Sequence, residues 1–209
     1  MKTNQSLRTT LLLFAFLGFA LNAQAQDATT AAGAPTYGLI GQEYTGVSFG
    51  YTRQDDGPPD ALRGIGVIFN RPAAVNLDTA FKYDFTRSSA FGMHNNEHRI
   101  AANALWYWSN VGAKPFVEAD AGWVFRKFAG DSGSGFVYLI GAGVEIQVKP
   151  RLVVTPFVNY QDVSEFKDRK WSYGAKVTYR LAQEWSASGR LQIDEDQNVE
   201  YRLGMNRHF

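Results

Sequence analysis

Apolar and polar residues alternate along most of the chain from residue 37 onward. A period of two sends successive side chains to opposite faces of an extended strand, so each alternating run predicts one β-strand. Turn-forming residues separate the runs, as at 55–59, where two aspartates, a glycine and two prolines stand together. Ten strands are predicted in this way, over 42–53, 61–70, 76–87, 99–109, 114–127, 135–148, 151–161, 170–181, 184–193 and 199–209.

The seventh of these runs contains Pro156, which has no backbone N–H to give to a strand ladder. We therefore expect this strand to be bulged at the proline. Loss of one hairpin would leave eight strands, which is the alternative to ten.

The two faces of the predicted strands differ in chemistry, because one is apolar and aromatic and the other carries charge. Alternation alone does not say which face is inside, since a soluble barrel buries the apolar face and a membrane barrel turns it toward lipid. The tryptophans favour the membrane barrel, because all five lie on the apolar face toward strand ends, where aromatic girdles form. The predicted girdle consists of Trp106, Trp108, Trp123, Trp171, Tyr173, Tyr179 and Trp185. The fold class predicted is all-β, a transmembrane, antiparallel, up-and-down β-barrel.

The composition argues against several classes of function. Aromatic residues make up 14% of the 209 residues, and the mean hydropathy of −0.26 averages a lipid-facing surface with charged residues and polar loops. A net charge of +1 gives no support for nucleic-acid binding, which needs a strong basic excess. The chain has no cysteine, which excludes disulfides, thiolate metal sites and cysteine nucleophiles.

The first 25 residues have the pattern of a secretory signal peptide. Lys2 and Arg8 precede an apolar run over 11–21, and a small-x-small cleavage pattern follows at 23–25. The run is shorter than the roughly 20 residues that a membrane-spanning helix needs. We expect residues 1–25 to be removed on export, residues 26–36 to form a flexible periplasmic leader, and residues 37–209 to form the barrel.

The last predicted strand ends in an aromatic residue, with apolar residues alternating before it. This pattern resembles the C-terminal assembly signal of Gram-negative outer-membrane β-barrel proteins. Arg207 departs from the family pattern, which usually has an apolar residue there, although its stem can reach along the membrane edge. The residues that carry the resemblance are Tyr201, Leu203, Met205 and Phe209.

The resemblance implies a small porin-like or OmpA-like barrel in a bacterial outer membrane. It also implies insertion by the barrel-assembly machinery and contact with outer-membrane lipids and lipopolysaccharide, and we expect a monomer. An even number of strands places both termini in the periplasm. The connections near 55–60, 88–98, 128–134, 162–169 and 194–198 are then predicted to be extracellular.

The charged face predicts the lining of the lumen. Acidic residues gather on the third, fifth and sixth predicted strands and basic residues on the last three, and a closed barrel sets these strands opposite each other. Two interpretations stay open: an ion-pair network that fills the lumen in a structural role, or a narrow passive pore with opposed acidic and basic walls. The predicted lumen residues are Asp78, Lys82, Asp84, Glu118, Asp120, Arg126, Glu145, Lys176, Arg180, Arg190, Glu200 and Arg202.

The 88–98 connection holds the residues that an enzyme would use. Ser88, Ser89, His94, Glu97 and His98 include the components of a Ser–His–acid set, and the two histidines could hold a metal ion. Polar residues are ordinary in a loop and no family motif accompanies them, so we expect no enzyme, no metal and no cofactor. A further alternative is a recognition or adhesion barrel that acts through its extracellular loops.

Overall fold

A computed structural model describes residues 38–54, 62–90, 93–109, 112–128, 131–166 and 168–209. The signal peptide and the leader predicted from the sequence lie outside the described residues. The ten strands are β1 (Tyr44–Arg53), β2 (Leu62–Ala74), β3 (Leu77–Ala90), β4 (Met93–Tyr107), β5 (Ala113–Phe128), β6 (Asp131–Lys149), β7 (Leu152–Val163), β8 (Asp168–Ala182), β9 (Trp185–Asp194) and β10 (Val199–His208).

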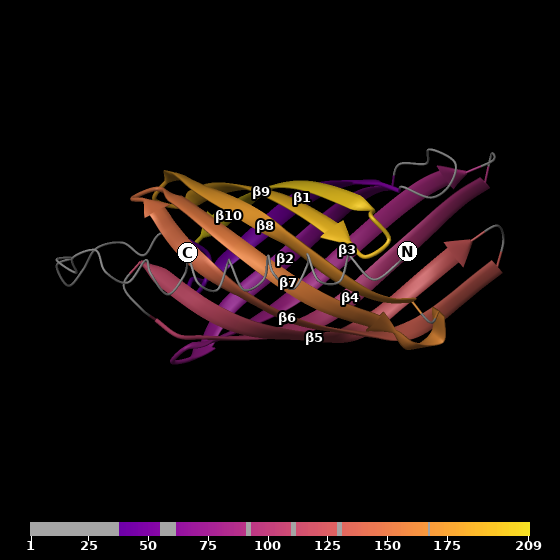
Figure 1. The fold of residues 1–209 in the computed structure, drawn as a ribbon, viewed down its shortest axis with the longest axis horizontal. Helices are drawn as coiled ribbons and strands as arrows, with labels where there is room; N and C mark the ends of the chain where they lie inside the picture. The colour runs from indigo at the N-terminus through magenta and orange to yellow at the C-terminus, as the bar shows by residue number, and fades with distance from the viewer. Residues whose placement is uncertain (1–37, 55–61, 91–92, 110–111, 129–130, 167) are drawn as a thin grey trace, which may run out of the picture.

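The strands form one closed antiparallel barrel in which each strand pairs with its neighbours in the sequence (Figure 1). The barrel closes where β1 pairs with β10, from Tyr44↔His208 to Arg53↔Val199. The prediction of a ten-stranded up-and-down barrel is confirmed, and the alternative of eight strands is wrong. Among the described residues, no helical segment has the length and apolar character needed to cross a bilayer.

The two ends of the barrel differ, and each is named here for what it carries. The hairpin edge holds the connections that join β1 to β2, β3 to β4, β5 to β6, β7 to β8 and β9 to β10. The terminal edge holds the start of β1, the end of β10 and the other four turns. Register shifts fall in the last residues of β2, β6 and β8, next to turns of the terminal edge, between Pro72 and Ala74, Gln147 and Lys149, and Arg180 and Ala182.

Several strands are longer than predicted at the hairpin edge. β3 continues to Ala90 and β4 already begins at Met93, so the predicted 88–98 connection is wrong. Polar residues do not end these strands, because their backbones still pair: Ser88 lies opposite Asn95, whose side chain donates to the serine hydroxyl at 3.3 Å. The predicted 162–169 connection is also too long, since β7 reaches Val163 and only a 3-10 turn, η2 (Ser164–Phe166), and residue 167 precede β8.

The expected bulge at the proline of β7 is wrong as well. The β6–β7 ladder has no partner rows between Gly143↔Phe157 and Ile146↔Val154, but the register is the same on both sides of the gap. On the other side of the strand Pro156 lies in register with Ala175. The missing N–H of Pro156 therefore interrupts one ladder locally and leaves the strand count unchanged.

The burial pattern is the reverse of that of a soluble protein. Large apolar side chains point outward, with Phe49, Leu203 and Phe209 exposed by 63%, 70% and 71%. Asp120 and Glu145, in contrast, are buried. Charged side chains are almost never fully buried unless they are paired. The apolar face therefore lies outside and the charged face lines the lumen.

The residues of the predicted aromatic girdle lie toward both edges of the barrel. Trp123, Trp171 and Tyr173 lie toward the hairpin edge, and Trp106, Trp108, Tyr179 and Trp185 lie toward the terminal edge.

Candidate functional site in the lumen

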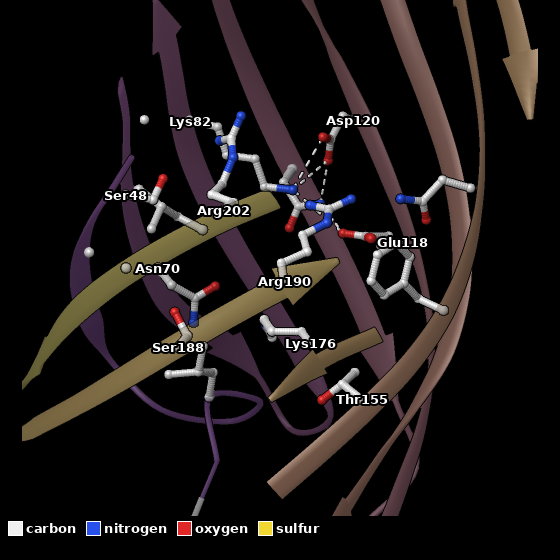
Figure 2. A pocket seen from close by; sticks show the side chains of 18 of the residues that line it. Ser48, Asn70, Lys82, Glu118, Asp120, Thr155, Lys176, Ser188, Arg190 and Arg202 are labelled. Carbon is white, nitrogen blue, oxygen red and sulfur yellow. Dashed lines mark hydrogen bonds and ion pairs between the residues drawn. The ribbon is translucent and has the colours of Figure 1, made fainter. Parts of the chain in front are cut away.

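A cavity of about 310 Å³ lies inside the barrel, lined by charged and polar side chains from the strand walls (Figure 2). Of the predicted lumen residues, those that line it are Lys82, Asp84, Glu118, Asp120, Glu145, Lys176, Arg190, Glu200 and Arg202. The other three lie off the cavity, with Asp78 and Arg180 toward the terminal edge and Arg126 toward the hairpin edge. Sequence reasoning missed Arg99 and Lys170, which also line the cavity. Arg99 could have been found from the sequence, because it lies four residues before Asn103 in the same predicted strand and therefore on the same polar face.

The acids of β5 are neutralised by cations from β3 and β4. The Lys82 ammonium lies 3.1 Å from Asp120 and 3.5 Å from Glu118, and Arg99 lies 3.7 Å from Asp120. Asn103 on β4 donates its amide to both carboxylates. Figure 2 shows Lys82 joined to both acids on one side of the lumen. Buried charges need such partners. The charges of this cluster are therefore paired with one another on the wall formed by β3, β4 and β5.

A second ion-pair cluster depends on a missing side chain. Arg202 on β10 pairs with Glu200 at 3.0 Å and reaches across β1 and β2 to Asp84 on β3. Gly66 of β2 leaves this path open, because a Cβ there would meet Asp84 Oδ1 at 2.6 Å and Arg202 Nη1 at 2.8 Å. The glycine thus allows an ion pair between strands that are not adjacent.

Lys176 and Arg190 differ from the other lumen cations. They lie directly opposite each other on β8 and β9, and neither has a carboxylate within 4.0 Å among the described residues. The Arg190 guanidinium stacks over the Phe157 ring, 4.4 Å from its centroid, and donates to Gln192. Stacking on an aromatic face holds a guanidinium in place without neutralising it.

Residues 38–43, called here the plug segment, enter the lumen at the terminal edge and line the cavity with Leu39 and Ile40. Glu145 of β6 accepts hydrogen bonds from the backbone N–H groups of Leu39 at 3.0 Å and Ile40 at 3.3 Å. Asp78 of β3 accepts one from Gly41 at 2.7 Å. Two buried carboxylates therefore bind backbone amides of the segment, a charge-assisted and strong form of hydrogen bond.

Further contacts hold the same segment from other strands. Lys114 on β5 donates to the Ile40 carbonyl and Asn70 on β2 donates to the Gln42 carbonyl, both at 2.7 Å. The Ile40 side chain packs in an apolar cluster with Tyr107 and Phe116. The plug segment is thus held by β2, β3, β4, β5 and β6, inside the lumen at its terminal edge.

Two glycines make the plug segment fit. Gly38 and Gly41 have φ angles of +117° and +79°, where residues with a Cβ are strained. A Cβ at Gly38 would overlap the Glu145 carboxylate, and one at Gly41 would lie 2.8 Å from the Tyr107 hydroxyl. Sequence reasoning missed this element; its only signal is an apolar pair between two glycines at the end of a polar leader.

The described members of the 88–98 cluster do not form a Ser–His–acid set. Glu97 and His98 follow each other on β4, so their side chains lie on opposite faces. Glu97 pairs with Arg126 in the lumen, whereas His98 lies on the outer face with its Nδ1 2.9 Å from the Tyr83 hydroxyl. The side chains of Ser89 and His94 lie outside the described part of the structure. Within the described residues, no three histidine or acidic side chains are grouped as a metal site.

The predicted assembly signal lies on the outer surface of β10. Tyr201 and Met205 are exposed by 52% and 42%, alongside Leu203 and Phe209. The guanidinium of Arg207 lies over the ring of Phe209, 5.5 Å from its centroid, and 3.9 Å from the Glu184 carboxylate. These contacts give the one charged residue of this motif two partners at the terminal edge.

No protein-family model and no curated protein matches the chain. Solved structures do match. The NanC porin has a TM-score of 0.50 at 7% identity, with 79% of this chain and all of the porin covered. The KdgM porin, solved in complex with disordered oligogalacturonate, has a TM-score of 0.47 at 8% identity, over 78% of this chain and 99% of that one. The translocator domain of the autotransporter NalP from Neisseria meningitidis scores 0.48 at 12% identity, over 97% and 98%.

The chain has the fold of an outer-membrane β-barrel porin. The resemblance that the last strand indicated is therefore confirmed at the level of fold. At such low identity the likeness carries no information about solutes or partners, which have to be argued from the lumen and the outer surface.

Proposed function

We propose that the protein is a narrow solute pore of a bacterial outer membrane, closed at its terminal edge by the plug segment. The observation that carries this proposal is the manner of closure. The residues that stand in the terminal mouth precede β1 and are not part of the strand walls, and hydrogen bonds to Asp78 and Glu145 hold them there. A segment attached in this way can leave the mouth while the ten strands stay paired around the lumen.

The space behind the plug segment supports a pore over a purely structural barrel. A cavity of about 310 Å³ is far larger than the site of a single water molecule. Wall side chains largely fill the interior of small barrels that have no conducting role. Here β1 and β2 carry glycines in place of larger side chains, at Gly46, Gly50, Gly64 and Gly66.

The orientation we propose places both chain termini in the periplasm and the hairpin edge outside the cell. The outer face of the hairpin edge carries Arg63, Arg87 and Lys127 in one row of the sheet, through the pairs Arg63↔Arg87, Arg87↔Asn96 and Asn96↔Lys127. All three cations are exposed, and among the described residues none has a carboxylate within 4.0 Å. Such a row suits the phosphate groups of lipopolysaccharide, the partner proposed for this edge.

The remaining partner proposal concerns insertion. The apolar residues of β10, together with exposed Phe209, support recognition of the last strand by the barrel-assembly machinery. The described connections at the hairpin edge are short, as at 195–198 between β9 and β10, which gives less surface for an adhesion role.

Single-channel recording tests the pore. The chain from residue 26 is refolded in nonionic detergent, its folding is checked by the heat-dependent shift in gel mobility, and it is added to planar bilayers. We expect rare conductance steps from this chain and frequent steps from a chain that begins at residue 44 and lacks the plug segment. If the chain that begins at residue 44 folds and gives no steps, the pore proposal is refuted.

A further inference from the structure

Two cations of the lumen lack the neutralisation that every neighbouring cation has. In the row that crosses β8, β9 and β10, Lys176 lies opposite Arg190, and Arg190 lies opposite Arg202. Arg202 is neutralised by two carboxylates, but Lys176 and Arg190 have none within 4.0 Å among the described residues. Like charges directly opposite each other destabilise a sheet, and more so where water is restricted.

The surroundings of these two cations offer hydrogen-bond donors that also lack acceptors. Thr155 of β7 lies opposite Lys176, is buried, and its hydroxyl has no hydrogen-bond partner in the described part of the chain. The Nε of Arg190 has no acceptor there either. Thr155, Lys176 and Arg190 all line the same cavity, and Ser188 lines it beside them (Figure 2). Buried donors without acceptors require an explanation, and a bound ligand is one.

We propose that Thr155, Lys176 and Arg190 form a binding site for a small oxyanion, a carboxylate or phosphate group, inside the lumen. The chemistry of the donors selects this class. A guanidinium, an ammonium and a hydroxyl present several N–H and O–H donors from different directions, which matches the several oxygens of an oxyanion. A cation is excluded by the two positive charges, and a neutral solute would leave them unneutralised.

The site goes beyond the proposed pore, because binding does not require conductance. It supplies the lumen with a place where an anionic solute is held between the plug segment and the hairpin edge. Glu118 and Asp120 form their ion pairs with Lys82 and Arg99 and none with Lys176 or Arg190, so neither carboxylate occupies the space beside these two cations.

Isothermal titration calorimetry on the refolded chain in nonionic detergent and chloride buffer tests the site, with inorganic phosphate and acetate as separate probes. We expect saturable binding of at least one probe, weakened about tenfold or more by Lys176→Gln and by Arg190→Gln, since each removes a charged donor. Lys149→Gln is the matched control, because Lys149 is exposed at the end of β6 with no ion pair among the described residues. Its affinity should equal that of the unaltered chain.

Two further variants protect the test against a folding defect. Lys176→Arg keeps the charge and should keep binding within about threefold, while Thr155→Val keeps the shape, removes the hydroxyl and should weaken binding severalfold. The proposal is overturned if neither probe binds the unaltered chain saturably, or if the folded Lys176→Gln and Arg190→Gln variants bind as tightly as it does. Binding without conductance would refute the pore and leave this site in place.

Discussion

Glu145→Gln is the sharpest perturbation of the plug segment, because it changes one carboxyl oxygen to an amide and keeps the volume. Glu145 is 3% exposed and accepts from the amides of Leu39 and Ile40. A hydrogen bond to a charged group contributes about 1.5–3 kcal/mol, and one between neutral groups about 0.5–1.5 kcal/mol. Losing the charge should therefore weaken each of the two bonds by about 1 kcal/mol, or about 2 kcal/mol together.

That loss sets the expected change in plug release. About 2 kcal/mol corresponds to roughly 30-fold in an equilibrium constant, so the unplugged population should rise by about that factor. The absence of native cysteines allows a direct assay. A cysteine placed at Leu39, which is 5% exposed, should react with a charged maleimide only from the unplugged state, and Glu145→Gln should raise its labelling rate about 30-fold.

Single-channel open probability should rise in parallel in the same variant. The matched control is Glu184→Gln, since Glu184 lies at the same edge of the barrel but is exposed and outside the lumen. Unchanged labelling and unchanged open probability in a folded Glu145→Gln chain would show that the carboxylate does not hold the plug segment, and the reasoning would fail.

Three other predictions concern the wall, the lipid face and the cation row. Gly66→Val should destabilise the barrel by about 1–3 kcal/mol in denaturant titration, because the added side chain enters the path of the ion pair that crosses β2; equal stability would contradict that account. Leu203→Arg should cost about 2–4 kcal/mol in lipid vesicles, since the residue is exposed in the middle of β10, and no loss would place this surface outside the bilayer core. The Arg63→Gln, Arg87→Gln double variant should lose stabilisation by lipopolysaccharide in thermal unfolding, whereas Arg71→Gln at the terminal edge should keep it.

The barrel could be predicted from the sequence because its information is local. Side chains alternate with a period of two in every strand, so the faces, the strand number and the outward direction of Trp123 or Leu203 follow from short windows. The prediction failed at the hairpin edge for a related reason. Strands such as β3 and β4 continue past the apolar band, where alternation of polar residues no longer distinguishes a strand from a loop.

The lumen could be predicted only as a set of residues, not as a set of contacts. The pairing of Arg202 with Asp84 depends on the register of four strands and on the space left by Gly66, none of which a single strand reveals. The plug segment is harder still. Leu39 meets a carboxylate 106 residues away in the sequence, and nothing periodic marks the segment.

The plug segment and the proposed oxyanion site share one cavity, and this should make them depend on each other. When the plug segment is bound, one Glu145 oxygen accepts from two backbone amides and the other lies 3.7 Å from Lys114, and this leaves Lys176 without a carboxylate within 4.0 Å. When the segment leaves, Glu145 loses both amide donors and keeps only Lys114, so its negative charge acts more strongly on the same cavity, where it repels an anion and attracts Lys176. Linkage is reciprocal, so an anion that prefers the plugged lumen must also stabilise it. Phosphate should therefore slow labelling of the cysteine at Leu39, and it should lose this effect in the Lys176→Gln background. Equal slowing in both backgrounds would trace the effect to ionic strength and would separate the two features.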